Sequence, residues 1–240
     1  MQSRLRISDT ATRLISFLWV SHLVPGIVSK HRTESDLLTH FRKIGVDVHP
    51  HEWSAKKIYN REGKERTILR KLASFDVGMN RINSIEAWQQ TTKRGRVSII
   101  HYELRYIILF KSATTLYRIP ILTNAITVQD ADRKTLQWNG FTWGKLTILA
   151  DRLKPDTELN ANLQTFFNTG VLGGLRIHAF SSNAISITTD LNMQRLPSRD
   201  LLLCIECLAR HIDSYISEQN KFRDDFEEAV KTKLFGSRGS

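Results

Sequence analysis

The first hundred residues carry apolar positions at the spacing of amphipathic helices. Two short helices are predicted near the start of the chain, one over residues 9–24 and one that follows the capping sequence of residues 33–36. Two more are predicted over residues 64–75 and 80–90, where apolar residues again recur three and four positions apart. Residues 1–96 are therefore interpreted as a basic helical region.

At Val97 the hydrophobic pattern changes to a period of two. Residues 97–110 alternate between the two faces of a strand and are rich in aromatic and β-branched side chains, so they predict a long strand. The end of this segment is apolar on both faces, which predicts burial on both sides. Further strands are predicted over residues 115–122, 125–128 and 136–138.

Two hairpins are predicted from turn residues. Asn139-Gly140 is typical of a two-residue hairpin turn, and this turn would bring Trp138 and Trp143 to the rim of a hairpin. The second hairpin joins strands over residues 176–180 and 184–189.

Two helices are predicted in the last third of the chain. One covers residues 154–167, and a long one begins after Ser198, which supplies a capping hydroxyl. The fold class is therefore α+β, with a basic N-terminal helical half, an antiparallel β-rich middle and a long C-terminal helix. The predicted division is 1–96 and 97–235, or one continuous domain over both, followed by a flexible tail at 236–240.

The net charge of the protein lies entirely in its first half. Residues 1–120 hold 21 Lys/Arg and 10 Asp/Glu, a net charge of +11, whereas residues 121–240 hold 14 of each. Residues 53–96 have the highest density of positive charge, with 11 basic and 4 acidic side chains. A concentrated positive field attracts nucleic acid or an anionic membrane face.

Ten basic residues of this region are predicted to contact nucleic-acid phosphates, with Tyr59 or Trp53 available to stack on bases. The candidate binding residues are Lys56, Lys57, Arg61, Lys64, Arg66, Arg70, Lys71, Lys93, Arg94 and Arg96. The competing interpretation is a solvated face whose cations meet the acidic residues 224–228, within one chain or between subunits.

These features favour a non-enzymatic binding and assembly protein. It would bind the backbone of RNA rather than DNA, without sequence preference, as a ribonucleoprotein or nucleocapsid-like subunit. Self-association or a protein partner is expected through the β-rich half and the C-terminal helix. A second interpretation is a peripheral membrane or matrix-type protein that inserts Trp19 or the Trp138–Trp143 hairpin. A third is a winged-helix regulator with residues 64–75 in the major groove.

Cys204, Cys207 and His211 invite a zinc interpretation, with a fourth ligand from residues 49–52. The pattern departs from the His-x-Glu and Pro-Cys-x-x-Cys arrangement of zinc deaminases, because leucines precede Cys204 and the histidine adjoins the glutamate. We therefore favour small buried cysteines and expect no metal, no cofactor and no catalytic residue.

Two cysteines three residues apart exclude a disulfide framework and indicate a reducing compartment, so an intracellular protein of the cytoplasm or nucleus is expected. Residues 1–32 contain a single acidic residue beside several arginines, which makes an organelle-targeting presequence an alternative. The apolar stretch of residues 14–28 is too short and too polar to predict a membrane span.

Overall fold

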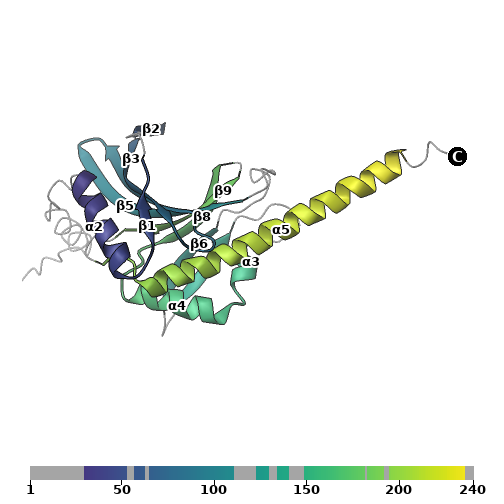
Figure 1. The fold of residues 1–240 in the computed structure, drawn as a ribbon. Helices are drawn as coiled ribbons and strands as arrows, with labels where there is room; N and C mark the ends of the chain where they lie inside the picture. Colours follow the sequence, from purple (N-terminus) through teal and green to yellow (C-terminus); the bar gives the residue numbers. More distant parts are fainter. Residues whose placement is uncertain are drawn as a thin grey trace, which may run out of the picture.

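The computed structural model describes residues 30–52, 57–62, 65–110, 123–129, 134–140, 149–181, 183–191 and 195–235. These residues form an α+β fold in which helices pack on an antiparallel sheet (Figure 1). The α+β class and the long C-terminal helix are confirmed. The predicted helix over residues 9–24, the strand over 115–122 and the tail at 236–240 lie outside the described residues.

Nine strands among the described residues belong to one sheet. Their order is β1-β3-β4-β5-β9-β8-β6-β7, and β2 pairs with β3 on the same edge as β1. The sheet runs without interruption across residue 96, because β4 and β5 pair along their whole length. The strands are β1 (Val48–Pro50), β2 (Lys57–Glu62), β3 (Glu65–Val77), β4 (Ser84–Arg94), β5 (Val97–Leu109), β6 (Thr123–Gln129), β7 (Lys134–Gly140), β8 (Leu175–Ser181) and β9 (Ala184–Asp190).

The core lies on one face of this sheet. One cross-strand row pairs Phe75 with Ile85, Ile85 with Tyr106, Tyr106 with Ile187 and Ile187 with Ile177, and all five side chains are fully buried. Directly paired residues of a sheet share a face, so this row is a continuous apolar surface. Burial of the apolar face against the helices is what stabilises the sheet.

Four helices of the described residues build the helical layer. Figure 1 shows α5 running beneath the sheet and projecting beyond it, with α3 and α4 beside its first half. Residues Leu201, Ile205, Leu208 and Ile212 of α5 are buried in the core, as its helical spacing predicts. The helices are α2 (Lys30–Lys43), α3 (Leu149–Leu153), α4 (Thr157–Asn168) and α5 (Arg199–Phe235). None of them combines the length and the apolar composition that crossing a membrane requires.

The predicted helices over 64–75 and 80–90 are wrong, because residues 65–77 form strand β3 and residues 84–94 form strand β4. A register shift between Lys71 and Ala73 breaks the alternation of β3, so its apolar residues fall at helical spacing by coincidence. Pairing with strands on both sides then outweighs the local pattern. Among the described residues from 30 to 96, α2 is therefore the only helix, and residues 65–75 form a strand in place of a winged-helix recognition helix.

The predicted hairpin turn at Asn139-Gly140 is also wrong. Both residues lie inside β7, opposite Asn124 and Thr123 of β6, and the chain reverses between Gln129 and Lys134 instead. Trp138 is 5% exposed, and its indole Nε1 donates a hydrogen bond to Asn160 Oδ1 at 2.7 Å. This side chain is therefore a core residue and cannot insert into a membrane, while Trp19 and Trp143 lie outside the described residues.

Other local predictions are confirmed. Residues 97–110 form β5, the β8–β9 hairpin matches the second predicted hairpin, and Ser198 Oγ accepts the backbone N–H of Leu201 at the start of α5. Asp156 caps α4 through the backbone N–H of Leu159 at 2.9 Å. Gly170 follows α4 with a φ of 69°, a left-handed conformation that favours glycine.

Candidate functional site

The predicted basic residues lie on adjacent strands at one end of the sheet. The register pairs Arg61 of β2 with Arg66 of β3, and Arg66 with Lys93 of β4, so the three positions form one row on a single face. Four residues further along the same face, Lys57 pairs with Arg70. Strands about 4.8 Å apart place three cationic positions within about 10 Å.

We name this region the basic sheet end and define it as Lys57, Arg61, Arg66, Arg70, Lys93, Arg94 and Arg96. Arg94 follows Lys93 directly, so its position lies on the other face of β4. Lys93 and Arg96 are exposed and Arg70 is half-buried. The row of Lys57 and Arg70 continues into Gln89 and Tyr102, which are half-buried as well. The face therefore offers cations together with amide and phenol groups. Lys56, Lys64 and Trp53 lie outside the described residues.

Lys71 does not belong to this surface. It follows Arg70 directly, so it faces the opposite side of the sheet, where its ammonium forms an ion pair with Glu86. The ammonium also lies 5.3 Å from the ring centroid of Trp88, whose Nε1 donates to Glu86 at 2.8 Å. Lys71 is therefore left out of the proposed phosphate-contacting surface, because its charge is neutralised and mostly buried.

The Lys71–Glu86 pair is one part of a charged network on that opposite face. Glu103, which is 3% exposed, accepts hydrogen bonds from Arg105 Nε at 2.7 Å and from Arg176 at 3.1 Å. The Arg105 guanidinium stacks 4.5 Å from the centre of the Trp88 ring. Buried charges require such partners, so the network acts as a structural element of the sheet. The sequence gives no local signal for this network, because its members lie on four different strands, β3, β4, β5 and β8.

Two histidines flank this network, and their pKa values are shifted in opposite directions. His101 Nε2 lies 3.0 Å from Asp190 Oδ1, and this hydrogen bond raises the pKa of His101 against the opposing effect of burial. Burial and the nearby Arg105 lower the pKa of His178. The two imidazoles therefore favour different protonation states within one sheet.

The basic sheet end also exposes apolar side chains. Val97, Ile99 and Ile100 of β5 are 61%, 60% and 53% exposed, next to the turn that carries Arg96 and opposite the end of β4 that carries Lys93. The sequence predicts a strand here, but only the structure shows that no described residue covers these side chains. Successive side chains of a strand lie on opposite faces, so Ile100 shares the face of Lys93, while Val97 and Ile99 lie on the other face.

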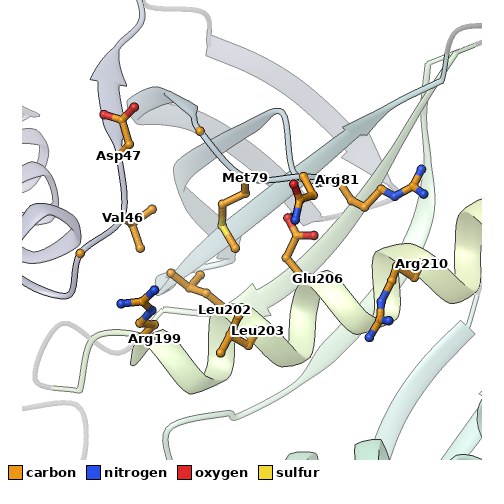
Figure 2. Close-up of a pocket in the computed structure, with 12 residues that line it drawn as sticks. Val46, Asp47, Met79, Arg81, Arg199, Leu202, Leu203, Glu206 and Arg210 are labelled. Atoms are coloured by element: carbon orange, nitrogen blue, oxygen red, sulfur yellow. Dashed lines mark hydrogen bonds between the residues drawn. The ribbon is translucent and has the colours of Figure 1, made fainter.

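A cleft of about 880 Å³ lies between the first turns of α5 and the β3–β4 turn (Figure 2). Figure 2 shows Glu206 rising from α5 toward Arg81. Glu206 Oε1 accepts the backbone N–H groups of Arg81 and Ile82 at 3.0 and 3.2 Å, and Arg81 pairs with Asp213. These contacts hold the β3–β4 turn against α5, so Glu206 and Arg81 serve the fold.

The cysteine cluster differs from the predicted arrangement. Cys204 is buried, and burial raises the pKa of its thiol to about 11. Cys207 and His211 instead meet Asp156, and the potential ligand atoms of the three residues lie within 4.8 Å of one another. Within the described ranges, no group of potential metal ligands includes residues 49–52.

Comparison of the chain with models of known protein families, with curated proteins and with solved structures finds no match. The function of the protein must therefore be argued from its own charge, register and side-chain geometry.

Proposed function

We propose that this protein is a non-enzymatic binding and assembly protein that contacts the RNA backbone through the basic sheet end. The observation that carries the proposal is the cross-strand row of Arg61, Arg66 and Lys93. Backbone phosphates lie close together along a nucleic-acid strand, so basic residues at strand positions about 5 Å apart can neutralise several of them at once.

RNA is favoured over duplex DNA by the shape and chemistry of this surface. An extended sheet face with aromatic side chains suits single-stranded nucleic acid, whose unpaired bases stack on aromatic rings. Tyr102 is half-buried on the same face as the cationic rows, and Tyr59 occupies the row between them. Contacts to phosphates and base faces carry no sequence code, so binding is proposed to be independent of sequence.

The test is fluorescence anisotropy of a mixed-sequence RNA oligonucleotide across a salt series. Lys93→Glu/Arg96→Glu removes two proposed contacts, which should reduce the magnitude of the slope of log K against log salt by about 1.4. The matched control is Arg42→Glu/Lys43→Glu, which changes the net charge equally at two exposed positions on α2. Equal loss of affinity in both variants, or no RNA binding by the natural sequence at low salt, would show that the site is misassigned.

An anionic membrane surface is the second candidate, and the exposed side chains of Val97, Ile99 and Ile100 favour it. Apolar groups beside cations can enter the interface while the cations meet lipid headgroups. Ile99→Ser/Ile100→Ser should then weaken co-sedimentation with phosphatidylserine vesicles and leave RNA affinity unchanged. Vesicle binding that is unaffected by this variant would remove the membrane candidate.

The assembly part of the proposal concerns residues 219–235 of α5, which we name the arm. The arm projects beyond the sheet in Figure 1, and Phe222, Phe226 and Val230 form an exposed stripe along it. It holds four basic and four acidic residues, so its net charge is zero in a chain of +11. We propose that the stripe packs against the arm of a second copy. The arms have no net charge, so they can approach without the electrostatic repulsion that acts between the positively charged remainders of the two chains.

Sedimentation equilibrium tests this association. Phe222→Ser/Phe226→Ser should shift the protein to a monomer, whereas Leu203→Ser, which changes an exposed leucine of α5 outside the arm, should not. A natural protein that is monomeric at high concentration would refute the assembly step while leaving the RNA proposal intact.

A further inference from the structure

A cluster of three different metal-ligating groups lies where α4 begins beside α5. Cys207 and His211 are four residues apart on α5 and so share one side of the helix. His211 Nε2 lies 2.8 Å from Asp156 Oδ2, and the Cys207 sulfur lies within 4.8 Å of both atoms. All three side chains are half-buried, so water and ions can reach them.

The fold fixes the carboxylate of this cluster. Asp156 Oδ1 accepts the backbone N–H of Leu159 at 2.9 Å, and its backbone carbonyl accepts Asn160 Nδ2 at 2.6 Å. One carboxylate oxygen is thus occupied by the start of α4, and the other is directed at His211. A ligand held in this way by its own hydrogen bonds is characteristic of the support that metal sites require.

The groove beside the cluster carries negative charge. It has a volume of about 680 Å³, and the charged residues of its lining are Asp156, Glu158, Asp200 and Arg210. Three carboxylates and one guanidinium give a net charge of −2, in a protein whose overall charge is +11. A local negative field in a basic protein favours a cation at this place.

We infer that this groove binds a zinc ion through the carboxylate of Asp156, the thiolate of Cys207 and the imidazole of His211. Zinc takes oxygen, sulfur and nitrogen ligands in a tetrahedron, whose ligand atoms lie about 3.3 to 3.8 Å apart. The cluster reaches this geometry when the half-exposed Cys207 moves inward and the ion replaces the hydrogen bond between His211 and Asp156.

Binding of the ion releases the thiol proton of Cys207 to solvent, because the thiolate is the ligand. A soft sulfur ligand favours zinc over magnesium or calcium, which prefer oxygen alone. Three protein ligands leave a fourth position that opens to the groove, where water completes the coordination. Cys204 also lines the groove one turn earlier on α5, but it does not belong to the group of ligand atoms that lie within 4.8 Å of one another.

The test uses the full chain, stripped with a chelator and titrated with Zn²⁺ against a chromophoric competitor. One equivalent of zinc should bind, and Co²⁺ should give the sulfur-to-metal charge-transfer band of a single thiolate. Cys207→Ser, His211→Gln and Asp156→Asn should each weaken zinc binding by about 100-fold or more. Asparagine also caps helices, so the last variant keeps the start of α4 intact.

Cys204→Ala is the matched control, because it removes the other cysteine of α5 and all three proposed ligands remain. Its zinc affinity and its cobalt band should equal those of the natural sequence, and circular dichroism verifies that each variant is folded. Failure of the natural sequence to bind one equivalent overturns the inference. So does a cobalt thiolate band that survives Cys207→Ser, or a loss of affinity in Cys204→Ala equal to that in the ligand variants.

Discussion

The charged network behind the sheet gives the sharpest prediction for stability, through the substitution Glu103→Gln. Glu103 is 3% exposed and its main partner Arg105 is 14% exposed, with a closest contact of 2.5 Å. Removing one partner of a buried ion pair costs about 3 to 5 kcal/mol, because the other charge is left uncompensated. Glutamine keeps the volume and one acceptor oxygen, so we expect the lower end, about 3 kcal/mol.

Arg176 provides the matched control. Its side chain is 46% exposed, so its contact with Glu103 is screened by solvent and is worth no more than about 1 kcal/mol. Arg176→Gln should therefore change the free energy of unfolding by less than about 1 kcal/mol. The comparison separates the buried pair from the exposed one at the same carboxylate.

Urea denaturation followed by circular dichroism measures both variants, together with thermal unfolding. A loss of about 3 kcal/mol in a chain of this size corresponds to a decrease in Tm of about 6 to 12 °C. The m-value should stay constant, which shows that the native state and not the denatured state has changed. A loss below about 0.5 kcal/mol for Glu103→Gln would refute the assignment of the network as structural.

Two further predictions concern histidine titration and a buried amide. The hydrogen bond with Asp190 raises the pKa of His101 above the value of about 6.5 that it has in the unfolded chain. The protonated imidazole therefore contributes free energy of unfolding at low pH, and this contribution is lost as the pH rises through the raised pKa. His178 has a lowered pKa and loses stability as pH falls below 6.5, so the glutamine variants of the two should change the pH slope of urea stability in opposite directions. Asn160→Asp should cost about 1 to 3 kcal/mol, because it keeps an acceptor for Trp138 but loses the amide donor to three backbone carbonyls; an unchanged urea midpoint would contradict this.

The elements that could be predicted from the sequence are those whose pattern is local. The strand β5, the helix α4 and the first half of α5 follow from alternation, a capping residue and a helical stripe. The strands β3 and β4 could not be predicted, because the register shift after Lys71 conceals the period of two and the deciding hydrogen bonds come from the neighbouring strands, not from within each segment.

The candidate sites show the same limit. Composition indicates where the cations concentrate along the chain, but Arg70 and Lys71 reach opposite faces of the sheet only once the register is known. No local signal joins Asp156 to Cys207, because the two are fifty-one positions apart in the sequence and meet only when α4 packs on α5.

The register also decides how much of the positive charge can act on a ligand. Lys71 and Arg81 both belong to the basic segment of residues 53–96. Lys71 forms an ion pair with Glu86, however, and Arg81 forms one with Asp213. Net charge thus overstates the surface available to a polyanion. RNA affinity should depend on the basic residues in the cross-strand rows and not on the total number of basic residues. Lys93→Glu should therefore cost more RNA affinity than Arg81→Glu, although both change the net charge equally. Equal effects in the salt series would show that the overall field, and not the arrangement on the sheet, attracts the RNA.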